Sequence, residues 1–370
     1  MILTKKVRIR PALEQEQQLW RSVGTARWVY NWTLSRQEEN HKHGGKFLSD
    51  GDLRKELTQL KHTEEYAWLC NVSNNVAKQA VKDACDAYKK MFKGLAKKPK
   101  FKSRKKSRPS FYNDTAKLKV KDQVVLLEKV GWMKTVEQLP IGVSYSNPRV
   151  TFDGKYWYLS VGINQEQVQQ KLTDEVVGID VGVKELAVCS NGMVFKNINK
   201  SAAVRKTEKR LRRLQRKVSR KYEMNKEGSR FVKTSNIVKV EKSIRLLHRR
   251  LTNIRTNHIH QATSAVAKTK PRAVVMETLN VSGMMKNRHL SQAIANQKLN
   301  EFIRQMKYKC EKRGATFMQA DRWFPSSKCC SGCGQVKTHL KLSDRIYECD
   351  CGLKIDRDLN AAINLAQLAV

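Results

Sequence analysis

Three acidic residues occupy positions where a carboxylate is costly unless it binds a cation. Asp180 lies inside the apolar stretch VVGIDVG, Glu277 ends the apolar stretch RAVVMETLN, and Asp358 begins the segment DLNAAINLAQLA. A carboxylate among apolar residues loses its hydration and needs a partner or a coordinated cation. Mg²⁺ takes oxygen ligands, commonly a few carboxylates together with phosphate oxygens of a substrate. Two such ions about 3.5–4 Å apart activate a water and stabilise the leaving oxygen in phosphodiester hydrolysis.

The specificity of this signal comes from the set, because each acid alone is ambiguous. A lone Asp in a strand is usually a turn or cap residue. Asp356, two residues before Asp358, fits either the N-cap of the final helix or a rival metal ligand. On a strongly basic chain, the ordered set predicts a hydrolytic Mg²⁺ site, in which Asp180, Glu277 and Asp358 are both catalytic residues and ligands of two ions.

Four cysteines near the carboxyl end have the spacing of a zinc site. Cys330-x-x-Cys333 and Cys349-x-Cys351 are separated by 15 residues, and a glycine follows each pair. This spacing is typical of a four-cysteine zinc ribbon. Glycine permits the tight turn in which backbone amides point at thiolate sulfur. Four thiolates at about 2.3 Å from one Zn²⁺ make a structural site rather than a catalytic one.

Two details leave the geometry of the zinc site open. The second pair has one residue between its cysteines where two are commoner, and Cys329 is a spare thiol that can compete for the metal. The remaining cysteines stand alone in apolar settings, where a free thiol behaves as a small core residue. We therefore expect these in the core: Cys70, Cys85, Cys189 and Cys310.

The charge of the chain predicts a polyanionic partner. Among 370 residues, 73 Lys and Arg stand against 34 Asp and Glu, a net charge of +39. Such a surface attracts nucleic acid, because phosphate neutralisation releases counterions. An anionic membrane is the rival partner, but no apolar run approaches the ~18–20 residues of a spanning helix. A ribosome-like basic protein explains the charge but not the carboxylates.

The start of the chain and its cysteines predict a cytoplasmic protein. MILTKKVRIRP has no signal-peptide core and no cleavage site. Nine cysteines in a chain of 370 residues do not suggest a disulfide scaffold. Clustered pairs instead read as metal ligands in a reducing compartment.

The amino-terminal region has the apolar spacing of a strand followed by helices. KKVRIR alternates up to Pro11 and predicts a short strand. Apolar residues at helical spacing predict helices from Ala12 onward, over 53–60 and over 76–92. The last helix leaves polar residues on its surface that we expect to contact nucleic acid: Lys78, Gln79 and Lys82.

A basic segment follows over residues 93–108, with nine basic residues, no acidic one, and Pro99. A packed element cannot bury so much charge, so we expect a linker over 93–112. Cations for phosphates, interleaved with rings for bases, suit a nucleic-acid strand; the alternative is a disordered, solvated tail. The rings in or beside it are Phe92, Phe101, Phe111 and Tyr112. The residues we expect to contact nucleic acid are Lys97, Lys98, Lys100, Phe101, Lys102, Arg104 and Lys105.

Residues from about 115 to 170 change to β patterns. Asp153-Gly154 between two alternating runs is a strong hairpin signal. Together with the first strand, these runs predict a small sheet or barrel around the helical insertion. From Val176, VVGIDVGVKELAVCS predicts two buried strands joined by a tight turn. Further strands are predicted at PRAVVMETLN and ATFMQADRW, with a helix over 299–310 between them.

Two long basic helices are predicted after the second of these buried strands. Their apolar spacing predicts an antiparallel helical pair whose outer faces are basic. The inward residues are Leu211, Leu214 and Val218 on the first, and Val240, Ile244, Leu247, Leu251 and Ile254 on the second. The outer residues that we expect to contact nucleic acid are Arg212, Arg213 and Arg216.

The order of these motifs resembles the TnpB proteins, which insertion sequences encode and which are similar to the nuclease core of type V CRISPR effectors. The resemblance spans essentially the whole chain and is carried by the PKFK-type basic segment, GIDVGVKELAV, METLNVSGMMKN, DRWFPSSKCCSGCG and DRDLNAAINLA. It implies α/β architecture plus β-barrel and helical parts. The expected parts are an RNase H-like RuvC nuclease domain with a zinc ribbon insertion, and an amino-terminal wedge β-barrel with a helical recognition insertion.

The resemblance also implies boundaries for these parts. The wedge barrel takes its first strand from 1–10 and its remainder from 114–172, around a helical recognition lobe over 11–113 with the basic linker 93–112. The RuvC-like nuclease takes 173–325 and, as its final helix, 354–370. The zinc-binding target-nucleic-acid domain lies between them at 326–353.

Family positions fall on the same site residues that chemistry selects. The three RuvC acids correspond to Asp180, Glu277 and Asp358, and the zinc ligands to Cys330, Cys333, Cys349 and Cys351. Two departures stand out. Many relatives have Asp directly after the catalytic Glu, where this chain has Thr278, and Cys329 stands where Thr is common.

The function implied is that of an RNA-guided DNA endonuclease that cuts beside a short target-adjacent motif. Expected partners are a guide RNA from the transposon end and a double- and single-stranded DNA target, with no membrane, the protein being a monomer on one RNA. Expected cofactors are two Mg²⁺ and one structural Zn²⁺. The rivals are a guided DNA-binding repressor without cleavage, and a guide-independent transposase or resolvase. Three intact acids favour cleavage over repression.

Overall fold

The computed structural model describes residues 1–166, 170–337, 339–340 and 344–369. Two predicted regions therefore lie partly outside the described residues. Residues 167–169 belong to the end of the expected wedge barrel at 172, and residues 338 and 341–343 belong to the spacer between the cysteine pairs. Contacts divide the chain into two compact units, Met1–Gln165 and Glu166–Val370. Among the described residues, no helix combines the length and apolar character needed to cross a bilayer.

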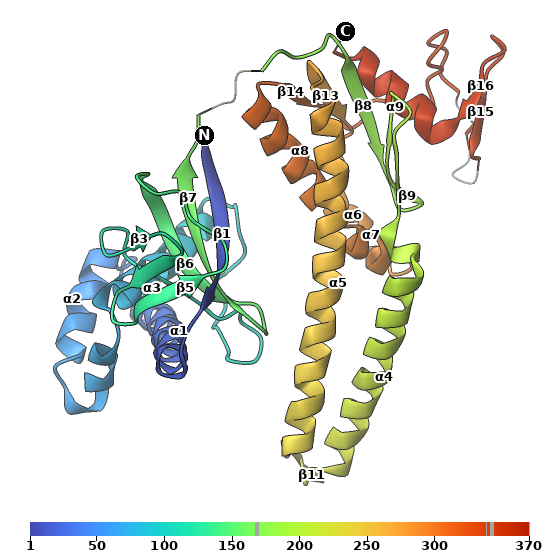
Figure 1. Ribbon diagram of the computed structural model, residues 1–370. Coiled ribbons are helices and arrows are strands. Elements are labelled where there is room, and N and C mark those ends of the chain that lie inside the picture. The colour runs from blue at the N-terminus through green and yellow to red at the C-terminus, as the bar shows by residue number, and fades with distance from the viewer. Residues whose placement is uncertain (167–169, 338, 341–343, 370) are drawn as a thin grey trace. The chain divides into compact units, whose positions relative to one another are not determined.

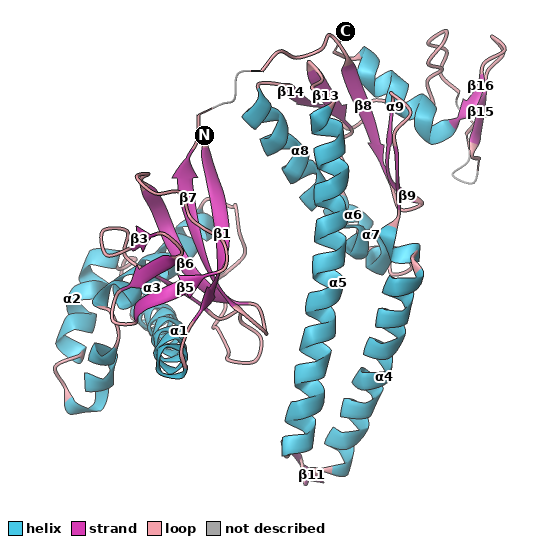
Figure 2. Ribbon diagram, in the orientation of Figure 1, coloured by secondary structure: helices cyan, strands magenta, loops and turns pink. Residues whose placement is uncertain are grey.

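The first unit is an antiparallel sheet with a helical insertion after its first strand (Figures 1 and 2). Its elements are β1 (Ile2–Arg10), α1 (Leu13–Lys42), α2 (Asp50–Leu60), the 3-10 helix η1 (Glu64–Asn71), α3 (Asn74–Phe92), β2 (Ser110–Tyr112), β3 (Lys119–Lys121), β4 (Val124–Leu127), β5 (Gly131–Thr135), β6 (Tyr145–Phe152) and β7 (Trp157–Asn164). The predicted first strand and helices are thus confirmed, with boundaries shifted by a few residues.

Strand β1 holds the sheet together because it pairs antiparallel with both β5 and β7. The seven strands follow the order β2-β6-β7-β1-β5-β4-β3. In the described chain, β2 and β3 are the two edges, so hydrogen bonds do not close the sheet into the expected barrel. The β6–β7 hairpin at Asp153-Gly154 is confirmed. Gly154 has φ +95°, and Asp153 Oδ1 accepts the backbone N–H of Lys155 at 3.0 Å and of Tyr156 at 2.9 Å.

Two predictions about single residues in this unit are wrong. Phe111 is 3% exposed in β2, where it pairs with Val150, so its ring lies in the core and cannot stack on a base. The sheet therefore takes residues from the end of the predicted linker, because alternation turns every second side chain of β2 inward. Cys70, predicted in the core, is exposed, whereas Cys85, Cys189 and Cys310 are buried as expected.

The second unit is a mixed sheet covered by helices (Figures 1 and 2). Its elements are β8 (Val176–Val181), β9 (Glu185–Cys189), β10 (Val194–Lys196), the 3-10 helix η2 (Ile198–Lys200), α4 (Ala202–Met224), β11 (Lys226–Glu227), β12 (Arg230–Phe231), α5 (Ser235–Lys268), β13 (Ala273–Met276), α6 (Val281–Met284), α7 (Ser291–Gln297), α8 (Leu299–Arg313), β14 (Thr316–Gln319), β15 (Ile346–Glu348), β16 (Lys354–Asp356) and α9 (Arg357–Gln367). The predicted strands and long helices are all present.

The central sheet of this unit has two differently covered faces. Its order is β10-β9-β8-β13-β14, with β8, β13 and β14 parallel. Side chains alternate between faces along each strand. Val177 and Ile179 of β8 belong to the core that α5 and α8 cover, whereas Val275 of β13 packs with Leu365 of α9 in a second cluster. Helix α9 therefore lies on the face opposite to α5 and α8.

The two long basic helices form the predicted antiparallel pair. Val204 and Leu211 of α4 pack with Leu247 and Leu251 of α5. An ion pair between Arg255 Nη2 and Glu208 Oε1, 2.7 Å long, ties the same two helices together.

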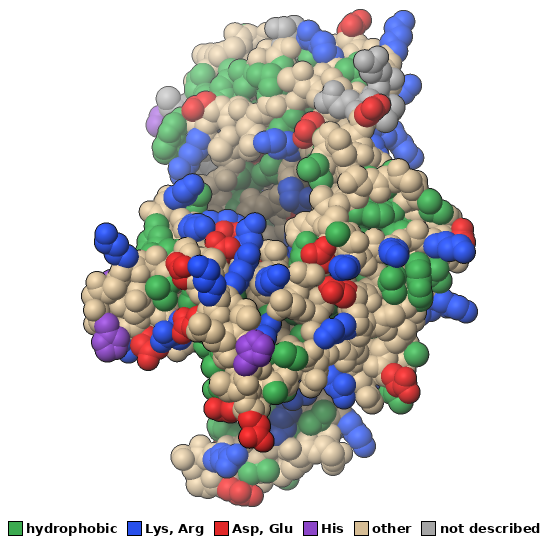
Figure 3. Space-filling view, turned by 90° about the vertical axis from the view of Figure 1, so that its left-hand side faces the viewer, with side chains coloured by type: hydrophobic (Ala, Val, Ile, Leu, Met, Phe, Trp, Pro, Cys, Tyr) green, Lys and Arg blue, Asp and Glu red, His purple; other side chains and the backbone are tan. Residues whose placement is uncertain are grey.

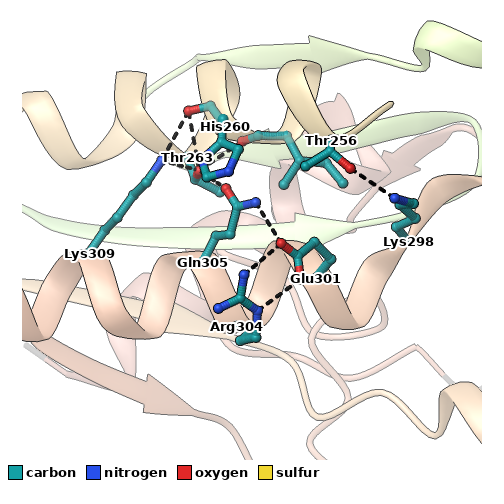
Figure 4. Close-up of polar contacts among 9 residues, drawn as sticks. Thr256, His260, Thr263, Lys298, Glu301, Arg304, Gln305 and Lys309 are labelled. Carbon is teal, nitrogen blue, oxygen red and sulfur yellow. Dashed lines mark hydrogen bonds and ion pairs between the residues drawn. The ribbon is translucent and has the colours of Figure 1, made fainter. Parts of the chain in front are cut away.

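A buried polar network joins α5 to α8 (Figure 4). Thr263 and Gln305 are both 0% exposed, and the Thr263 hydroxyl donates to Gln305 Oε1 at 3.1 Å. Gln305 in turn donates to Glu301 Oε1 at 2.8 Å. The Arg304 guanidinium holds the pKa of Glu301 at about 2, so this carboxylate stays ionised. Lys309 Nζ donates to Thr263 Oγ1 at 2.6 Å. This network fixes α8 against α5, the two helices that cover one face of the sheet.

Candidate active site and cysteine cluster

The three predicted acids meet on the face of the sheet covered by α9. Asp180 lies two residues after Gly178 in β8, so the two residues are on the same face of the sheet. Glu277 follows β13 directly, and the register that pairs Met276 with Ile179 brings Glu277 beside Asp180. Asp358 lies in the first turn of α9, which packs against β8. Three segments separated widely in sequence thus deliver their carboxylates to one place.

Burial and the neighbouring negative charges raise the pKa of two of these carboxyl groups. The pKa of Asp180 is raised well above its ordinary value, first by burial, then by the charges of Glu277 and Asp358. The pKa of Glu277 is also raised by burial, although hydrogen bonds to Asp180 and the Val181 backbone oppose the rise. Like charges in a desolvated site disfavour each other's ionisation. A cation bound between them would remove this penalty.

The residues flanking Asp358 have structural roles. Asp356 Oδ1 accepts the backbone N–H groups of Asp358 at 2.9 Å and Leu359 at 3.2 Å, so the N-cap interpretation of Asp356 is confirmed. This cap satisfies amides at the helix start, whose positive end favours an acid in the first turn. Arg357 Nη2 lies 3.5 Å from Asp358 Oδ1.

Thr278, the residue directly after Glu277, is tied to the neighbouring strand by a hydrogen bond. Its hydroxyl donates to the backbone oxygen of Ala320 at 2.7 Å. This contact links the segment after β13 to the end of β14. In this chain the residue after Glu277 therefore supports the strand ends that carry the site.

Helix α9 approaches the sheet at a glycine. A Cβ at Gly178 would lie 2.5 Å from the backbone nitrogen of Ala366 and closer still to the oxygen of Ala362. Only a residue without a side chain allows this contact. Ala361, Ala362 and Leu365 are buried on the same helix. The distance between Asp180 and Asp358 is thus set by direct packing of helix backbone on strand.

The acids suit Mg²⁺ in their chemistry but form an open site. Among the residues that the structure describes, the four cysteines alone have ligand atoms all within 4.8 Å of one another. Mg²⁺ retains several waters and binds substrate phosphate with only one or two carboxylates per ion. The three carboxylates are less tightly grouped than the cysteines, and Asp180 and Glu277 are hydrogen bonded to each other. This arrangement therefore fits Mg²⁺ together with its waters and a substrate phosphate.

The four predicted cysteines do come together. Their sulfur atoms form one compact group, with Cys330 Sγ 3.7 Å from Cys351 Sγ and Cys333 Sγ 3.6 Å from Cys349 Sγ. A disulfide would place two sulfurs about 2.05 Å apart. Zn–S bonds of about 2.3 Å in a tetrahedron place sulfurs about 3.8 Å apart. The observed separations therefore match a tetrahedral zinc site.

Two glycine turns shape this cluster as predicted. Gly334 has φ +78° and Gly352 has φ +91°, and each amide bonds back to the first cysteine of its pair at 2.9 Å. Burial raises the pKa of Cys330, but hydrogen bonds from the amides of Cys333 and Gly332 outweigh it and lower the pKa to about 7. Amides pointing at sulfur favour the thiolate that binds metal. Cys329 stays outside the group, with its sulfur 3.3 Å from the Gly334 oxygen.

The residues predicted to contact nucleic acid differ in solvent exposure and in whether another side chain of the protein already binds them. Lys78 and Lys82 of α3 are exposed, whereas Gln79 is partly buried and donates to Asp83 Oδ1 at 2.9 Å. In the basic segment, Lys98 pairs with Glu38 at 2.9 Å, and Lys102 lies 3.5 Å over the Tyr30 ring. These anchors contradict the alternative of a free, solvated tail. The residues that remain exposed are Lys97, Lys98, Lys100, Phe101, Arg104 and Lys105, and on α4 Arg212, Arg213 and Arg216.

The anchored segment borders a cavity of about 610 Å³ within the first unit. Its lining includes Gln79, Lys102, Arg104 and Trp20. Arg149 also lines it and is held by Asp83 through bonds of 2.6 and 2.8 Å. Lys and Arg side chains are spread widely over the face in Figure 3, with acidic side chains among them.

Two buried residues were not singled out from the sequence. Asn360 and Asn364 of α9 are 0% and 2% exposed, and both bond to the chain around the first cysteine pair. Their spacing of four residues in an otherwise apolar helix face is the signal that marks them, because buried amides need partners.

Three family models match the chain. They are described as a helix-turn-helix domain over residues 1–46, a probable transposase over 159–288, and a Cas12f1-like TNB domain over 300–365. In the first range the structure has a strand and one long helix, β1 and α1, rather than a pair of helices around a turn.

Similar proteins cover nearly the whole chain. It is 30% identical to a protein of Escherichia coli (strain K12), over 97% of this chain and 90% of that protein, named "Putative RNA-guided DNA endonuclease InsQ". A protein of Streptomyces pristinaespiralis with the same name, apart from InsQ, is 32% identical over 97% and 87%. A solved structure described as "Cryo-EM structure of the Cas12f1-sgRNA-target DNA complex" has a TM-score of 0.61 at 14% identity, covering 99% of this chain and 98% of that chain. That likeness shows a shared mixed α/β fold.

Proposed function

Because the chain belongs to the TnpB family, we propose that it is an RNA-guided DNA endonuclease whose hydrolytic site is formed by Asp180, Glu277 and Asp358. The observation that carries this proposal is the convergence of three carboxylates from β8, β13 and α9 on one face of the sheet, where their charges oppose one another. A site that costs free energy without a cation fits metal-dependent chemistry.

Each acid has a distinct place in this mechanism. Asp180 within β8 and Glu277 directly after β13 offer adjacent carboxylates, and Asp358 adds a third from the capped start of α9. Bound Mg²⁺ would activate a water and stabilise the leaving oxygen of an in-line phosphodiester displacement. The protein holds the three carboxylates in position before substrate arrives, so little reorganisation is needed. Hydrolysis of this kind would leave 5′-phosphates.

We assign the remaining parts by analogy with the family. Residues 173–325 and 354–370 would form the RuvC-like nuclease, 326–353 the zinc ribbon, and the sheet of the first unit the wedge. Guide RNA and target strands would lie along exposed cations of α3, the basic segment and α4. The cavity beside Gln79 and Arg104 is lined by basic and aromatic residues, which supports our proposal that the first unit would contact a nucleotide of the target-adjacent duplex there. Base pairing would read the rest of the target.

The cysteine cluster is proposed to hold one structural Zn²⁺. We expect metal analysis of the purified protein to find about one zinc per chain. Cys333→Ser should release it and lower the free energy of unfolding by several kcal/mol, because metal binding and folding of such a site are coupled. Cys70→Ser, at an exposed cysteine outside the cluster, serves as the control and should leave zinc content unchanged. Full zinc and wild-type stability in Cys333→Ser would rule out this ligand set.

The experiment that tests the function reprograms the guide. RNA that co-purifies with the protein is sequenced, and its guide portion is replaced to match a new site in a plasmid. Cleavage should move to the new site, require Mg²⁺ and disappear after RNase treatment. Target occupancy without Mg²⁺-dependent cutting would identify a guided repressor instead. Cutting that survives RNase would identify a guide-independent transposase or resolvase.

A further inference from the structure

Two buried asparagines join the helix of Asp358 to the cysteine cluster. The Asn360 side chain accepts the backbone N–H of Ser331 at 3.0 Å and donates to the oxygen of Cys329 at 2.6 Å. The Asn364 amide donates to the oxygens of Cys329 at 2.7 Å and Ser326 at 2.7 Å. These backbone groups border Cys330 on both sides. Both amides are almost wholly buried, so water cannot replace the bonds.

The second cysteine pair reaches the same helix through a strand. Cys349 directly follows β15, Cys351 precedes β16, and the two strands pair antiparallel. Strand β16 ends at Asp356, which caps α9 through the amide of Asp358. The cysteine cluster therefore holds α9 at two places: along the face that carries the asparagines, and at its first turn.

Helix α9 depends on such outside support. It has 11 residues, and an isolated helix of that length is marginal in water. One face packs on the sheet through Ala362 and Leu365. The opposite support comes from the asparagine bonds to the chain around Cys330. A loosened cluster would therefore free the first turn of α9, which carries Asp358.

We propose that Asn360 and Asn364 are positioning residues that couple metal binding at the four cysteines to the placement of Asp358. The coupling rests on the proposed function for its effect on cleavage, but it is a structural statement that can be tested without activity. Zinc in the cluster then does more than hold a nucleic-acid module together: it sets the geometry of the third carboxylate. Loss of zinc should impair hydrolysis before it impairs target binding.

The test compares Asn364→Leu with Gln367→Ala in the RNA-bound protein. Leucine fills a similar space but removes both amide bonds, while all four cysteines remain. Gln367 is exposed and makes one bond of 3.1 Å to Ser331 from the far end of the same helix, so its variant is the matched control. Zinc content, hydrogen exchange of the α9 and β13 amides, target binding and guided cleavage are measured for each.

In Asn364→Leu we expect about one zinc to remain per chain, α9 amides to exchange roughly tenfold faster or more, and β13 amides to stay protected. Cleavage should fall roughly tenfold while target affinity changes less than about twofold. Chelating the zinc of the wild type should accelerate α9 exchange in the same way, and should add little in the variant. Gln367→Ala should behave as the wild type.

Three results would overturn the coupling. They are α9 exchange unchanged in Asn364→Leu, α9 exchange unaffected by zinc removal from the wild type, and equal acceleration in α9 and β13, which would signal general unfolding. If the wild type does not cleave at all, the proposed function fails, while the exchange measurements still decide the coupling.

Discussion

Asp180→Ala should abolish guided DNA cleavage, lowering its rate roughly 10³-fold or more, while guide RNA and target DNA still bind. The pKa of Asp180 is raised well above its ordinary value by burial first and then by the charges of Glu277 and Asp358, so a bound cation would interact most directly with this carboxyl group. Without the Asp180 carboxylate, the proposed Mg²⁺ site lacks the ligand beside Glu277, and only Glu277 and Asp358 remain. Plasmid cleavage by reconstituted complexes, measured next to target binding by gel shift, checks both halves of this expectation.

The control for this experiment is Asp174→Ala, an exposed aspartate of the same unit just before β8. This substitution also removes one carboxylate, but outside the site, so the variant should cleave DNA as the wild type does. Equal cutting by Asp180→Ala and the wild type would remove Asp180 from the mechanism.

The same position has a second signature in stability. In a chelator, Asp180→Asn should raise the melting temperature, because it removes a desolvated charge from beside Glu277 and Asp358. Added Mg²⁺ should stabilise the wild type, since a ligand that binds the folded state shifts unfolding, and should stabilise this variant far less.

Gly178→Ala should destabilise the second unit by more than about 3 kcal/mol and eliminate cleavage. The new methyl group would collide with backbone atoms of Ala362 and Ala366, which cannot rotate away as a side chain can. Helix α9 would have to leave β8, and Asp358 would move away from Asp180. Denaturant unfolding and cleavage assays measure the two effects.

Gly182→Ala is the matched control, four residues along in the same GIDVG motif. A Cβ there meets its nearest neighbour, the Glu185 oxygen, at an ordinary 3.6 Å, and the backbone needs no special conformation. Its cost should stay below about 1 kcal/mol. Equal stability of the two alanine variants would show that close packing at Gly178 does not position α9.

Most elements of the fold could be predicted because their signals are local. Period-two and helical spacing marked β1, the hairpin at Asp153-Gly154 and the α4–α5 pair within a few residues. Errors arose where burial depends on distant partners. Phe111 follows a basic run that reads as solvated, yet it pairs with Val150 in the sheet. Cys70 has apolar neighbours in the sequence, yet its side chain is exposed at the surface of the 3-10 helix η1.

By itself, the sequence determined the chemistry: which acids and which cysteines the chain offers, its strong positive charge, and, through its motifs, its family. Residue type and spacing carry that information directly. Only the tertiary structure decided how these groups meet. Strand alternation and parallel register put Asp180 beside Glu277, and the contact at Gly178 brings α9 onto that face. Asn360 and Asn364 tie the same helix to the cysteines, a link between segments some 30 residues apart that no local pattern encodes.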